Sequence, residues 1–395
     1  MLPKIINTEE NLHTLINLAL HKKNVAVDTE FVWERTYYPK LGIVQIGFSK
    51  NECFLIDAVV LKDISPLGKL ISDSNVTKIL HDAHQDLAIL RKATGSFPKN
   101  IFDTQYAAGF IGESISISLR QLVHQLIGVN LSKTETRTNW MRRPLSRRQV
   151  DYALNDVRYL PSVMQKTVSR VSNNGIKEWL LEDLGELDNP DLYRERDTFI
   201  QIRRIKGTKR FTPREMAVLF ELVDWREREA RAQDRPREHI VTDRTLTSIT
   251  RNKPKNISEL RPTKDFPERK AREYGNEMVN AVNRGLSIPP LRYHRHRKRI
   301  MDDNTLNARV DFAMAYINGM CTNRRINPAT IGTRAEITEF VRDCSSKSYE
   351  THKLLRGWRN TFIGDKLKKL LAGQHAIWLD PSTGLPQITP PPVKR

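Results

Sequence analysis

A run of apolar residues that ends in two carboxylates constrains this chain more than any other stretch. Val25, Ala26 and Val27 have strand character, and Asp28 and Glu30 follow them one residue apart. Side chains on a strand alternate between faces, so the two carboxylates point the same way. Such a pair is tolerated when it is exposed, shares a proton, or holds a divalent cation between its oxygens. Read alone, the pair also fits a strand that runs out into a polar turn.

Further acidic residues along the chain complete a pattern. Asp86 opens a predicted helix around residues 85–92, and Asp156 follows Tyr152 by four positions in a predicted helix over 146–172. Residues four apart share a helix face, so Tyr152 and Asp156 point the same way. Four carboxylates supply the hard oxygen ligands that Mg²⁺ or Mn²⁺ prefers, and a pair of such ions activates water and stabilises a leaving oxygen. The order of these residues predicts a two-metal phosphoryl-transfer site in which the tyrosine orients the water.

Charge is distributed unevenly along the 395 residues. The first 190 residues carry a net charge of +2, and the rest of the chain carries +17 of the total of +19. This asymmetry indicates a near-neutral N-terminal domain joined to a basic C-terminal half that meets a polyanion. The three cysteines are widely spaced and fit neither a zinc site nor a disulfide framework, which favours a cytoplasmic protein. The sequence shows no membrane-spanning run and no signal-peptide layout, so we expect no membrane partner.

Secondary-structure patterns divide the chain into domains. Residues 11–22 have helical apolar spacing, and three strand-like runs follow. Short apolar runs then alternate with helices up to residue 190, which predicts an α/β domain over 1–190 with a mixed sheet flanked by helices. A charged connector is expected at 191–204. Strand signals then nearly vanish, and two small all-α bundles are expected at 205–290 and 295–375. Residues 376–395 are rich in proline and are expected to form an extended tail.

Several single residues mark local structure. Thr212 to Glu215 forms a capping box with proline at the first helical position, and Ser146 can cap the helix predicted after it. Trp225 fits the buried face of the helix that the capping box opens. Asp103 is expected to accept hydrogen bonds at a helix start.

Several stretches resemble the motifs of the ribonuclease D family. Those that are similar to its three exonuclease motifs lie at residues 27–31, 37–41, 43–47, 81–87 and 139–157. The segments at 205–219 and 225–237 are similar to the helical HRDC domain that follows in that family, and residues 295–375 match a second HRDC-like domain more loosely.

The resemblance implies an RNase H-like DEDD exonuclease domain of the tyrosine subtype, followed by one or two HRDC bundles. Carried over by position, Asp28 bridges two divalent cations, Mg²⁺ or Mn²⁺. Glu30 and Asp156 then hold the cation that binds the attacking water, Asp86 supports the second cation, and Tyr152 positions the water. The implied activity is 3′→5′ hydrolysis of RNA with release of nucleoside 5′-monophosphates. The implied partners are tRNA precursors and other small structured RNAs.

Seven further residues are candidates for substrate contacts. The aromatic residue beside the acids can stack on a terminal base, and the histidines and basic side chains of the second and third motifs can contact the substrate or its phosphates. Each also has an ordinary reading as a core aromatic, a strand-end histidine or a solvated charge. The candidates are Phe31, His81, His84, Lys133, Arg137, Arg142 and Arg143.

Two other functions stay open at this point. A DNA-directed 3′→5′ exonuclease uses the same acids, because the choice of RNA depends on contacts to the 2′-hydroxyl group. A non-catalytic RNA-binding protein would use the helical bundles alone, although the complete set of acids argues against it. The sequence contains no P-loop, Gly-rich dinucleotide motif or Ser-His-Asp arrangement that competes with the nuclease assignment.

Overall fold

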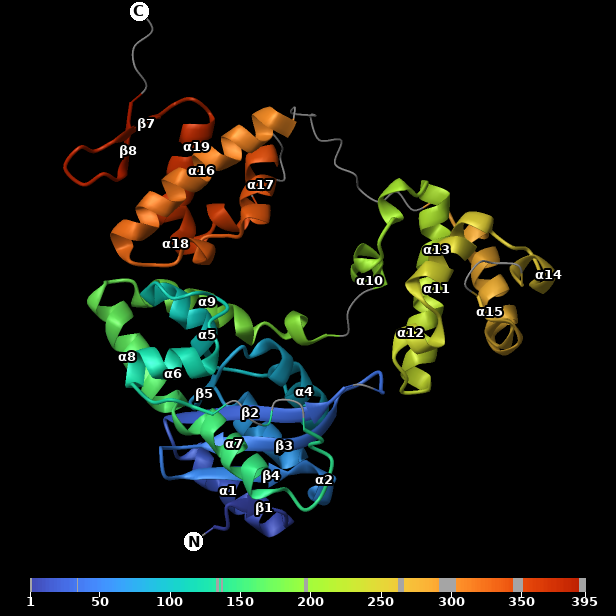
Figure 1. The fold of residues 1–395 in the computed structure, drawn as a ribbon, viewed down its shortest axis with the longest axis horizontal. Coiled ribbons are helices and arrows are strands. Elements are labelled where there is room, and N and C mark those ends of the chain that lie inside the picture. The colour runs from blue at the N-terminus through green and yellow to red at the C-terminus, as the bar shows by residue number, and fades with distance from the viewer. Residues whose placement is uncertain are drawn as a thin grey trace, which may run out of the picture. The chain divides into compact units, whose positions relative to one another are not determined.

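The computed structural model (Figure 1) divides into two compact units. The first unit comprises Met1–Glu30, Leu41–Tyr193 and Arg297–Arg395, and the second comprises Phe31–Lys40 and Arg194–His296. The residues that the structure describes are 2–33, 35–132, 135, 138–194, 198–261, 266–290, 303–343 and 351–390.

The first unit contains a six-stranded mixed sheet in the strand order β1-β4-β3-β2-β5-β6. Strands β3 and β4 are antiparallel, β1 runs parallel to β4, and β2, β5 and β6 run parallel to one another. The strands are β1 (Ile5–Ile6), β2 (Asn24–Val32), β3 (Lys40–Gly47), β4 (Cys53–Asp57), β5 (Thr77–Leu80) and β6 (Ile101–Asp103). The predicted mixed sheet with flanking helices is confirmed.

Helices cover both faces of this sheet (Figure 1). They are α1 (Glu9–Leu20), α2 (Ala58–Leu61), α3 (Gly68–Ser72), α4 (His84–Thr94), α5 (Thr104–Ala108), α6 (Leu119–Ile127), α7 (Arg147–Arg158), α8 (Leu160–Asn173) and α9 (Lys177–Gly185). Val25 and Val27 of β2 share one buried core with Leu15 of α1 and Leu87 of α4. Because side chains alternate along a strand, Asp28 and Glu30 face the opposite side of the sheet.

The third predicted motif forms two helices rather than one. Ser146 caps α7 in a capping box with Gln149, which confirms the predicted helix start. The helix predicted over 146–172 is wrong in its length, because it breaks at Tyr159 between α7 and α8. Pro161 lacks an N–H group, so it cannot continue the hydrogen-bond ladder to the carbonyl of Val157.

The second unit is a helical bundle. Its helices are α10 (Thr198–Arg204), α11 (Pro213–Ala232), α12 (Arg237–Ile240), α13 (Asp243–Asn252), α14 (Ile257–Leu260) and α15 (Glu268–Ser287). Thr212 and Glu215 form the predicted capping box, and Trp225 is buried in the bundle core as predicted. Helix α10 lies within the segment predicted as a connector, yet its Ile202 is buried in the same core as Trp225. The bundle therefore begins before residue 205.

The loop after β2 also belongs to the second unit. The hydroxyl group of Tyr37 donates a hydrogen bond to Glu227 Oε2 at 2.7 Å, and the Tyr38 N–H donates one to Asp234 Oδ1 at 3.2 Å. Glu227 is buried and forms an ion pair with Arg237 at 2.9 Å. The loop next to the strand of the acids is thus held by side chains of the helical bundle.

The C-terminal helices pack against α5 and α9 within the first unit. They are α16 (Asp303–Arg324), α17 (Arg334–Asp343), α18 (Gly357–Arg359) and α19 (Asp365–Leu371), and we call them the C-terminal bundle. The indole of Trp358 stacks on that of Trp179 with 4.8 Å between ring centroids, and the Asn327 N–H donates to the Gly109 carbonyl at 2.8 Å. An HRDC-like identity for this bundle stays a prediction.

The chain beyond the C-terminal bundle differs from the predicted extended tail. Strands β7 (Ala376–Leu379) and β8 (Pro386–Thr389) pair in an antiparallel hairpin, and Gly319 of α16 packs closely against Pro386. A proline at the first position of an edge strand leaves the ladder intact, which explains why the composition did not reveal the hairpin. Within the described residues, no helix has the length and apolar character needed to cross a membrane.

Candidate active site

Three elements bring four predicted carboxylates together. Asp28 and Glu30 extend from one face of β2, Asp156 comes from α7, and Asp86 lies in the first turn of α4. Single carboxylate oxygens of Asp28, Glu30 and Asp156 all lie within 4.8 Å of one another. The buried carboxylate of Asp86 accepts a hydrogen bond from the Thr29 hydroxyl group, between the two acids of β2. We call these four residues the acidic cluster.

The position of Asp86 depends on another acid, Asp103. The carboxylate of Asp103 accepts hydrogen bonds from the N–H groups of Asp82 (3.1 Å) and Ala83 (2.9 Å), just before α4. It also caps α5 by accepting from the N–H groups of Gln105 and Tyr106. Asp82 has a positive φ of 60°, a backbone conformation that is unfavourable for residues other than glycine. The hydrogen bonds to Asp103 stabilise the tight turn at this residue. The structural role predicted for Asp103 is confirmed.

Burial and mutual repulsion disfavour the charged form of each acid in the acidic cluster. Burial and the charges of Asp86, Asp156 and Glu30 raise the pKa of Asp28 well above its usual range. Burial, Asp156 and Asp86 raise the pKa of Glu30 to about 9. Burial and Asp86 raise the pKa of Asp156 to about 7, and burial raises that of Asp86 to about 7 although the Thr29 hydroxyl group opposes the shift. Four carboxylates in this state require protons or cations.

Tyr152 faces the same group of charges. Burial and the carboxylates of Asp156, Glu30 and Asp28 all raise the pKa of its phenol, which therefore keeps its proton. Its ring lies 6.2 Å, centroid to centroid, from the buried indole of Trp140. Trp140 in turn packs against Gly42 of β3, where a Cβ atom would lie 2.6 Å from the Trp140 carbonyl oxygen. The site thus presents one phenolic hydroxyl group beside the carboxylates.

The acidic cluster fits divalent cations. Its donors are all carboxylate oxygens, the ligands that hard cations such as Mg²⁺ and Mn²⁺ prefer. Burial and mutual repulsion raise the pKa values of Asp28 and Glu30, and a bound cation would supply positive charge that offsets both effects. The cluster also satisfies the spacing that a shared ion needs, because three of the acids offer oxygens within 4.8 Å.

Arg143 differs from its predicted role as a phosphate contact. Its guanidinium group donates to both oxygens of Asp57, at 2.5 and 2.6 Å, and to the carbonyl oxygens of Gly42 and Trp140, each at 2.9 Å. Asp57 is buried and also caps α2. Arg143 therefore fastens the loop before α7 to the sheet, and this partnership leaves its guanidinium group little capacity for a substrate phosphate.

His81 also has internal partners instead of a free ring. Its Nδ1 is 2.9 Å from the Thr104 hydroxyl group, and its Nε2 is 3.0 Å from the Ile117 carbonyl oxygen. Burial lowers the pKa of this imidazole although the Asp103 charge opposes the shift. Both nitrogens thus join β5 to the segments around α5 and α6, which differs from the predicted substrate contact.

The roles of the other candidate substrate contacts stay predictions. His84 and Arg142 are exposed, and Phe31 is half-buried directly after Glu30 on β2. Lys133 and Arg137 lie outside the described residues.

Two polar residues at the acidic cluster were not singled out from the sequence. The Gln45 side-chain amide on β3 donates to Asp28 Oδ2 at 3.4 Å, and the Thr29 hydroxyl group donates to Asp86. Both side chains are buried. The sequence alone could have indicated Gln45, because a glutamine within the apolar strand run Ile43–Gly47 is expected to be buried and a buried polar side chain requires a hydrogen-bond partner.

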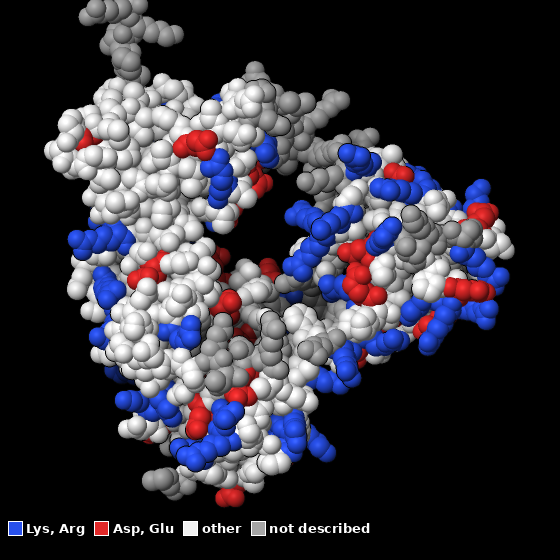
Figure 2. Space-filling view, in the orientation of Figure 1, with Lys and Arg blue, Asp and Glu red and all other residues white. Residues whose placement is uncertain are grey.

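Charged side chains of both signs lie on the second unit. Figure 2 shows many Lys and Arg side chains over the helices α11 to α15, interspersed with Asp and Glu. This distribution agrees with the basic C-terminal half predicted from the sequence.

Comparison with known proteins identifies the family. A family model described as a 3′-5′ exonuclease matches residues 3–171, and the HRDC domain model matches residues 215–282. The chain is 40% identical to ribonuclease D of Desulfotalea psychrophila over 91% of this chain and 96% of that relative. It is 38% identical to ribonuclease D of Pseudomonas paraeruginosa over 67% of this chain and 70% of the relative.

A solved structure agrees over nearly the whole chain. The crystal structure of Escherichia coli RNase D, described as an exoribonuclease involved in structured RNA processing, matches with a TM-score of 0.81 and 27% identity, and covers 94% of this chain and 99% of that one. The RNase H-like fold of such exonucleases implies the use of divalent metal ions, and RNA is the implied substrate. The chain belongs to the ribonuclease D family and is a 3′→5′ exoribonuclease.

Proposed function

We propose that this exoribonuclease trims the 3′ ends of tRNA precursors and other small structured RNAs by two-metal-ion hydrolysis. The observation that carries the proposal is the acidic cluster, in which four carboxylates from β2, α4 and α7 meet beside the phenol of Tyr152. Asp28, Glu30, Asp86 and Asp156 would hold the two cations, Mg²⁺ or Mn²⁺. When bound, these ions supply Lewis-acid activation of the attacking water and neutralise charge on the leaving oxygen.

The chain's own residues orient the reaction. The phenol of Tyr152 keeps its proton, so it can hydrogen-bond to the attacking water and direct a lone pair at the phosphorus. The terminal phosphodiester is attacked in line, and the bond between phosphorus and the preceding 3′-oxygen breaks. That oxygen takes a proton, so the products are an RNA shortened by one residue with a 3′-hydroxyl group and a nucleoside 5′-monophosphate.

The surroundings of the acidic cluster support a fixed geometry. Thr29 and Gln45 orient the carboxylates of Asp86 and Asp28, and both side chains are buried. Preorganised ligands lose little freedom when a cation or substrate arrives, which favours the transition state. His84 and Arg142, which are exposed at α4 and before α7, are the described candidates for contacts to the RNA backbone.

Substrate choice rests on the family and on the basic second unit. The E. coli relative is described as acting in structured RNA processing, and the HRDC domain with its Lys and Arg side chains offers a surface for an RNA body. A tRNA precursor combines a folded body with a short single-stranded 3′ end, the two features that a bundle and a nuclease site would engage.

The test is release of the 3′-terminal nucleotide from labelled RNA. The full-length chain is incubated with a 3′-labelled tRNA precursor, an unstructured RNA of equal length and a matched DNA, in Mg²⁺ or EDTA. We expect release from both RNAs, fastest from the precursor, and loss of release in EDTA and in Asp28→Asn by at least about 10³-fold. Asp151→Asn, an exposed acid on α7, is the matched control. Unchanged release by Asp28→Asn would overturn the site, and equal rates on both RNAs would overturn the substrate.

A further inference from the structure

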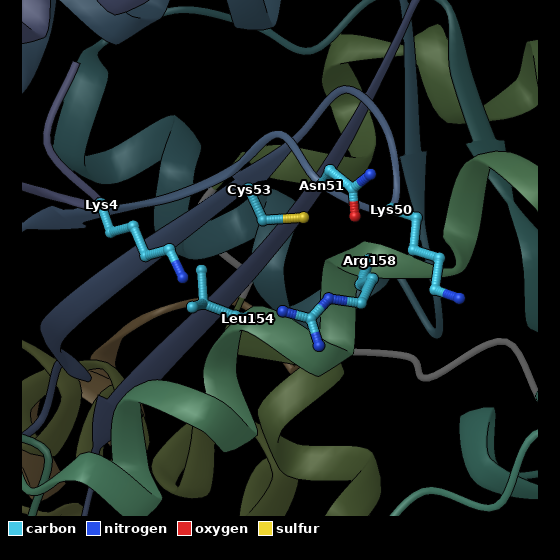
Figure 3. A pocket seen from close by; sticks show the side chains of 6 residues that line it. All are labelled: Lys4, Lys50, Asn51, Cys53, Leu154 and Arg158. Atoms are coloured by element: carbon cyan, nitrogen blue, oxygen red, sulfur yellow. The ribbon is translucent and has the colours of Figure 1, made fainter. Parts of the chain in front are cut away.

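The first unit contains a cavity that the acidic cluster does not use. Figure 3 shows the cavity, which has a volume of about 270 Å³, and the side chains that surround it. They come from the residue before β1, from the β3–β4 turn with the start of β4, and from α7. We call this site the basic pocket; its lining residues are Lys4, Lys50, Asn51, Cys53, Leu154 and Arg158.

The lining of the basic pocket carries positive charge without a matching acid. Lys4, Lys50 and Arg158 are cationic, and the other three lining residues are neutral. Glu52 lies in the same turn, but its carboxylate lies 3.9 Å from the ammonium of Lys22 and accepts from the Ser49 hydroxyl group at 3.3 Å. A concave surface lined by one sign of charge concentrates the potential and attracts counter-ions. The basic pocket therefore favours an anion.

Arg158 supplies the clearest sign of a missing partner. Its Nη1 donates to Asn155 Oδ1 at 2.6 Å, whereas its Nε–H is buried and makes no hydrogen bond within the described part of the chain. Figure 3 shows the guanidinium group extending from α7 towards Lys4 and Cys53. Burial raises the pKa of the Cys53 thiol, and the charge of Glu52 adds to that shift. The charge and a hydrogen bond of Arg158 and the charge of Lys4 oppose it, so both cations lie near this thiol. A buried donor without an acceptor is costly unless a ligand supplies one.

We propose that the basic pocket is a second anion site that binds a phosphate group. The guanidinium group of Arg158 matches phosphate oxygens through paired donors, while Lys4 and Lys50 add point charges and Asn51 an amide donor. Successive helical residues turn by about 100°, so Leu154 and Arg158 lie on roughly the opposite face of α7 from Tyr152 and Asp156. The phosphate belongs either to a free nucleotide or inorganic phosphate, or to an RNA backbone outside the catalytic site.

Binding of inorganic phosphate in EDTA tests the site directly, because turnover and the acidic cluster's cations play no part. Calorimetric titration of the full-length chain should show binding that weakens at least about tenfold in Lys4→Ala/Lys50→Ala and in Arg158→Gln. Lys69→Ala removes an exposed charge on α3 and is the matched control, with unchanged affinity expected. The double lysine variant changes only exposed side chains, so it remains informative if Arg158→Gln misfolds. Equal phosphate affinity in all the folded variants, or no binding by the unmodified chain, would overturn the proposal.

A second titration identifies the source of the phosphate. The affinity for a hairpin RNA with a single-stranded 3′ tail is measured against salt concentration in EDTA, together with the affinity for adenosine 5′-monophosphate. If the double lysine variant loses RNA affinity and its salt slope falls by about two ions, the site takes RNA phosphates. If it loses only phosphate and nucleotide affinity, the site takes the free molecule. Nucleotide release from a trinucleotide by this variant should stay within about twofold of the unmodified chain, so failure here would leave the catalytic proposal standing.

Discussion

Arg359 and Asp183 form a bidentate ion pair that joins the C-terminal bundle to α9. Arg359 Nη1 donates to Asp183 Oδ1 at 2.6 Å, and Nη2 donates to Oδ2 at 2.7 Å. Arg359 also donates to the Thr330 carbonyl, and the indole N–H of Trp358 donates to the same Asp183 carboxylate at 2.8 Å. Both partners of the pair are largely buried, with side-chain exposures of 12% and 7%. The C-terminal bundle is therefore fastened to the helices that flank the nuclease sheet.

Removal of one partner should loosen that attachment. Arg359→Ala leaves the Asp183 carboxylate buried without its main cation, which should lower the free energy of unfolding by about 3 kcal/mol. Hydrogen exchange followed by mass spectrometry should show faster exchange in α9 and in the C-terminal bundle, but not in α11. Arg342→Ala, on α17, is the control and should exchange like the unmodified chain. Unchanged protection of α9 in Arg359→Ala would contradict this account.

The acidic cluster makes stability depend on pH in the absence of metal. The pKa of Glu30 is raised to about 9, and those of Asp86 and Asp156 are raised to about 7. At pH values between the usual carboxyl pKa and these raised values, the folded state therefore binds more protons than the unfolded state. The free energy of unfolding contributed by these groups therefore falls as pH rises through that window. In EDTA the melting temperature should be lower at about pH 8.5 than at about pH 6.

Divalent cations should reverse this trend. Mg²⁺ or Mn²⁺ replaces the lost protons, so its stabilising effect should be larger at the higher pH. The control is Glu30→Gln, which removes one of the repelling charges and should be more stable than the unmodified chain in EDTA at the higher pH. Differential scanning calorimetry checks both statements. A metal-induced rise in melting temperature that is equal at both pH values would be inconsistent with carboxylates that lack cations.

Adjacent arginines before α7 should behave differently when substituted. Arg143→Ala breaks the pair with buried Asp57 and should cost about 3 kcal/mol in the free energy of unfolding. Arg142→Ala removes an exposed charge and should leave stability unchanged. It should raise KM for RNA by about fivefold, because this side chain is proposed to contact an RNA phosphate. Urea unfolding and steady-state kinetics separate the two. An unchanged urea unfolding curve for Arg143→Ala would contradict a stabilising role for the ion pair between Arg143 and Asp57.

The phenol of Tyr152 should act on the rate rather than on binding. Tyr152→Phe keeps the ring beside Trp140 and removes only the hydroxyl group that faces the acidic cluster. Misplacement of the attacking water should lower kcat about 10²-fold with little change in KM or melting temperature. Tyr159→Phe at the break between α7 and α8 is the matched control. Equal losses in both variants would point to a general effect of hydroxyl removal near α7.

The sequence predicted what short-range patterns encode. The alternation before Asp28, the capping residues Ser146 and Thr212, and the four-residue spacing of Tyr152 and Asp156 depend on neighbours in the chain, and each corresponds to an element in the fold. The charge of Arg143 was equally visible, but its partner Asp57 lies 86 positions away. His81 likewise finds partners at Thr104 and Ile117, so its position in a motif could not reveal that both nitrogens are engaged.

Other differences come from tertiary packing that overrides local composition. The segment of α10 appears charged, yet Ile202 enters the core of the second unit and makes the segment part of the bundle. The tail after α19 is rich in proline, yet Gln387 and Ile388 pair with Trp378 and Ile377 in a hairpin. Gln45 carried a polar side chain within an apolar run, but only the fold shows that it reaches Asp28 across the sheet.

The central claim is that Asp28, Glu30, Asp86 and Asp156 hold two divalent cations beside Tyr152. Anomalous scattering at the manganese absorption edge, from crystals grown with Mn²⁺ and adenosine 5′-monophosphate, tests it most directly. The account predicts two peaks about 3.5–4 Å apart within the acidic cluster, with oxygens of Asp28 in contact with both. A single peak there, or none, would contradict the two-metal site.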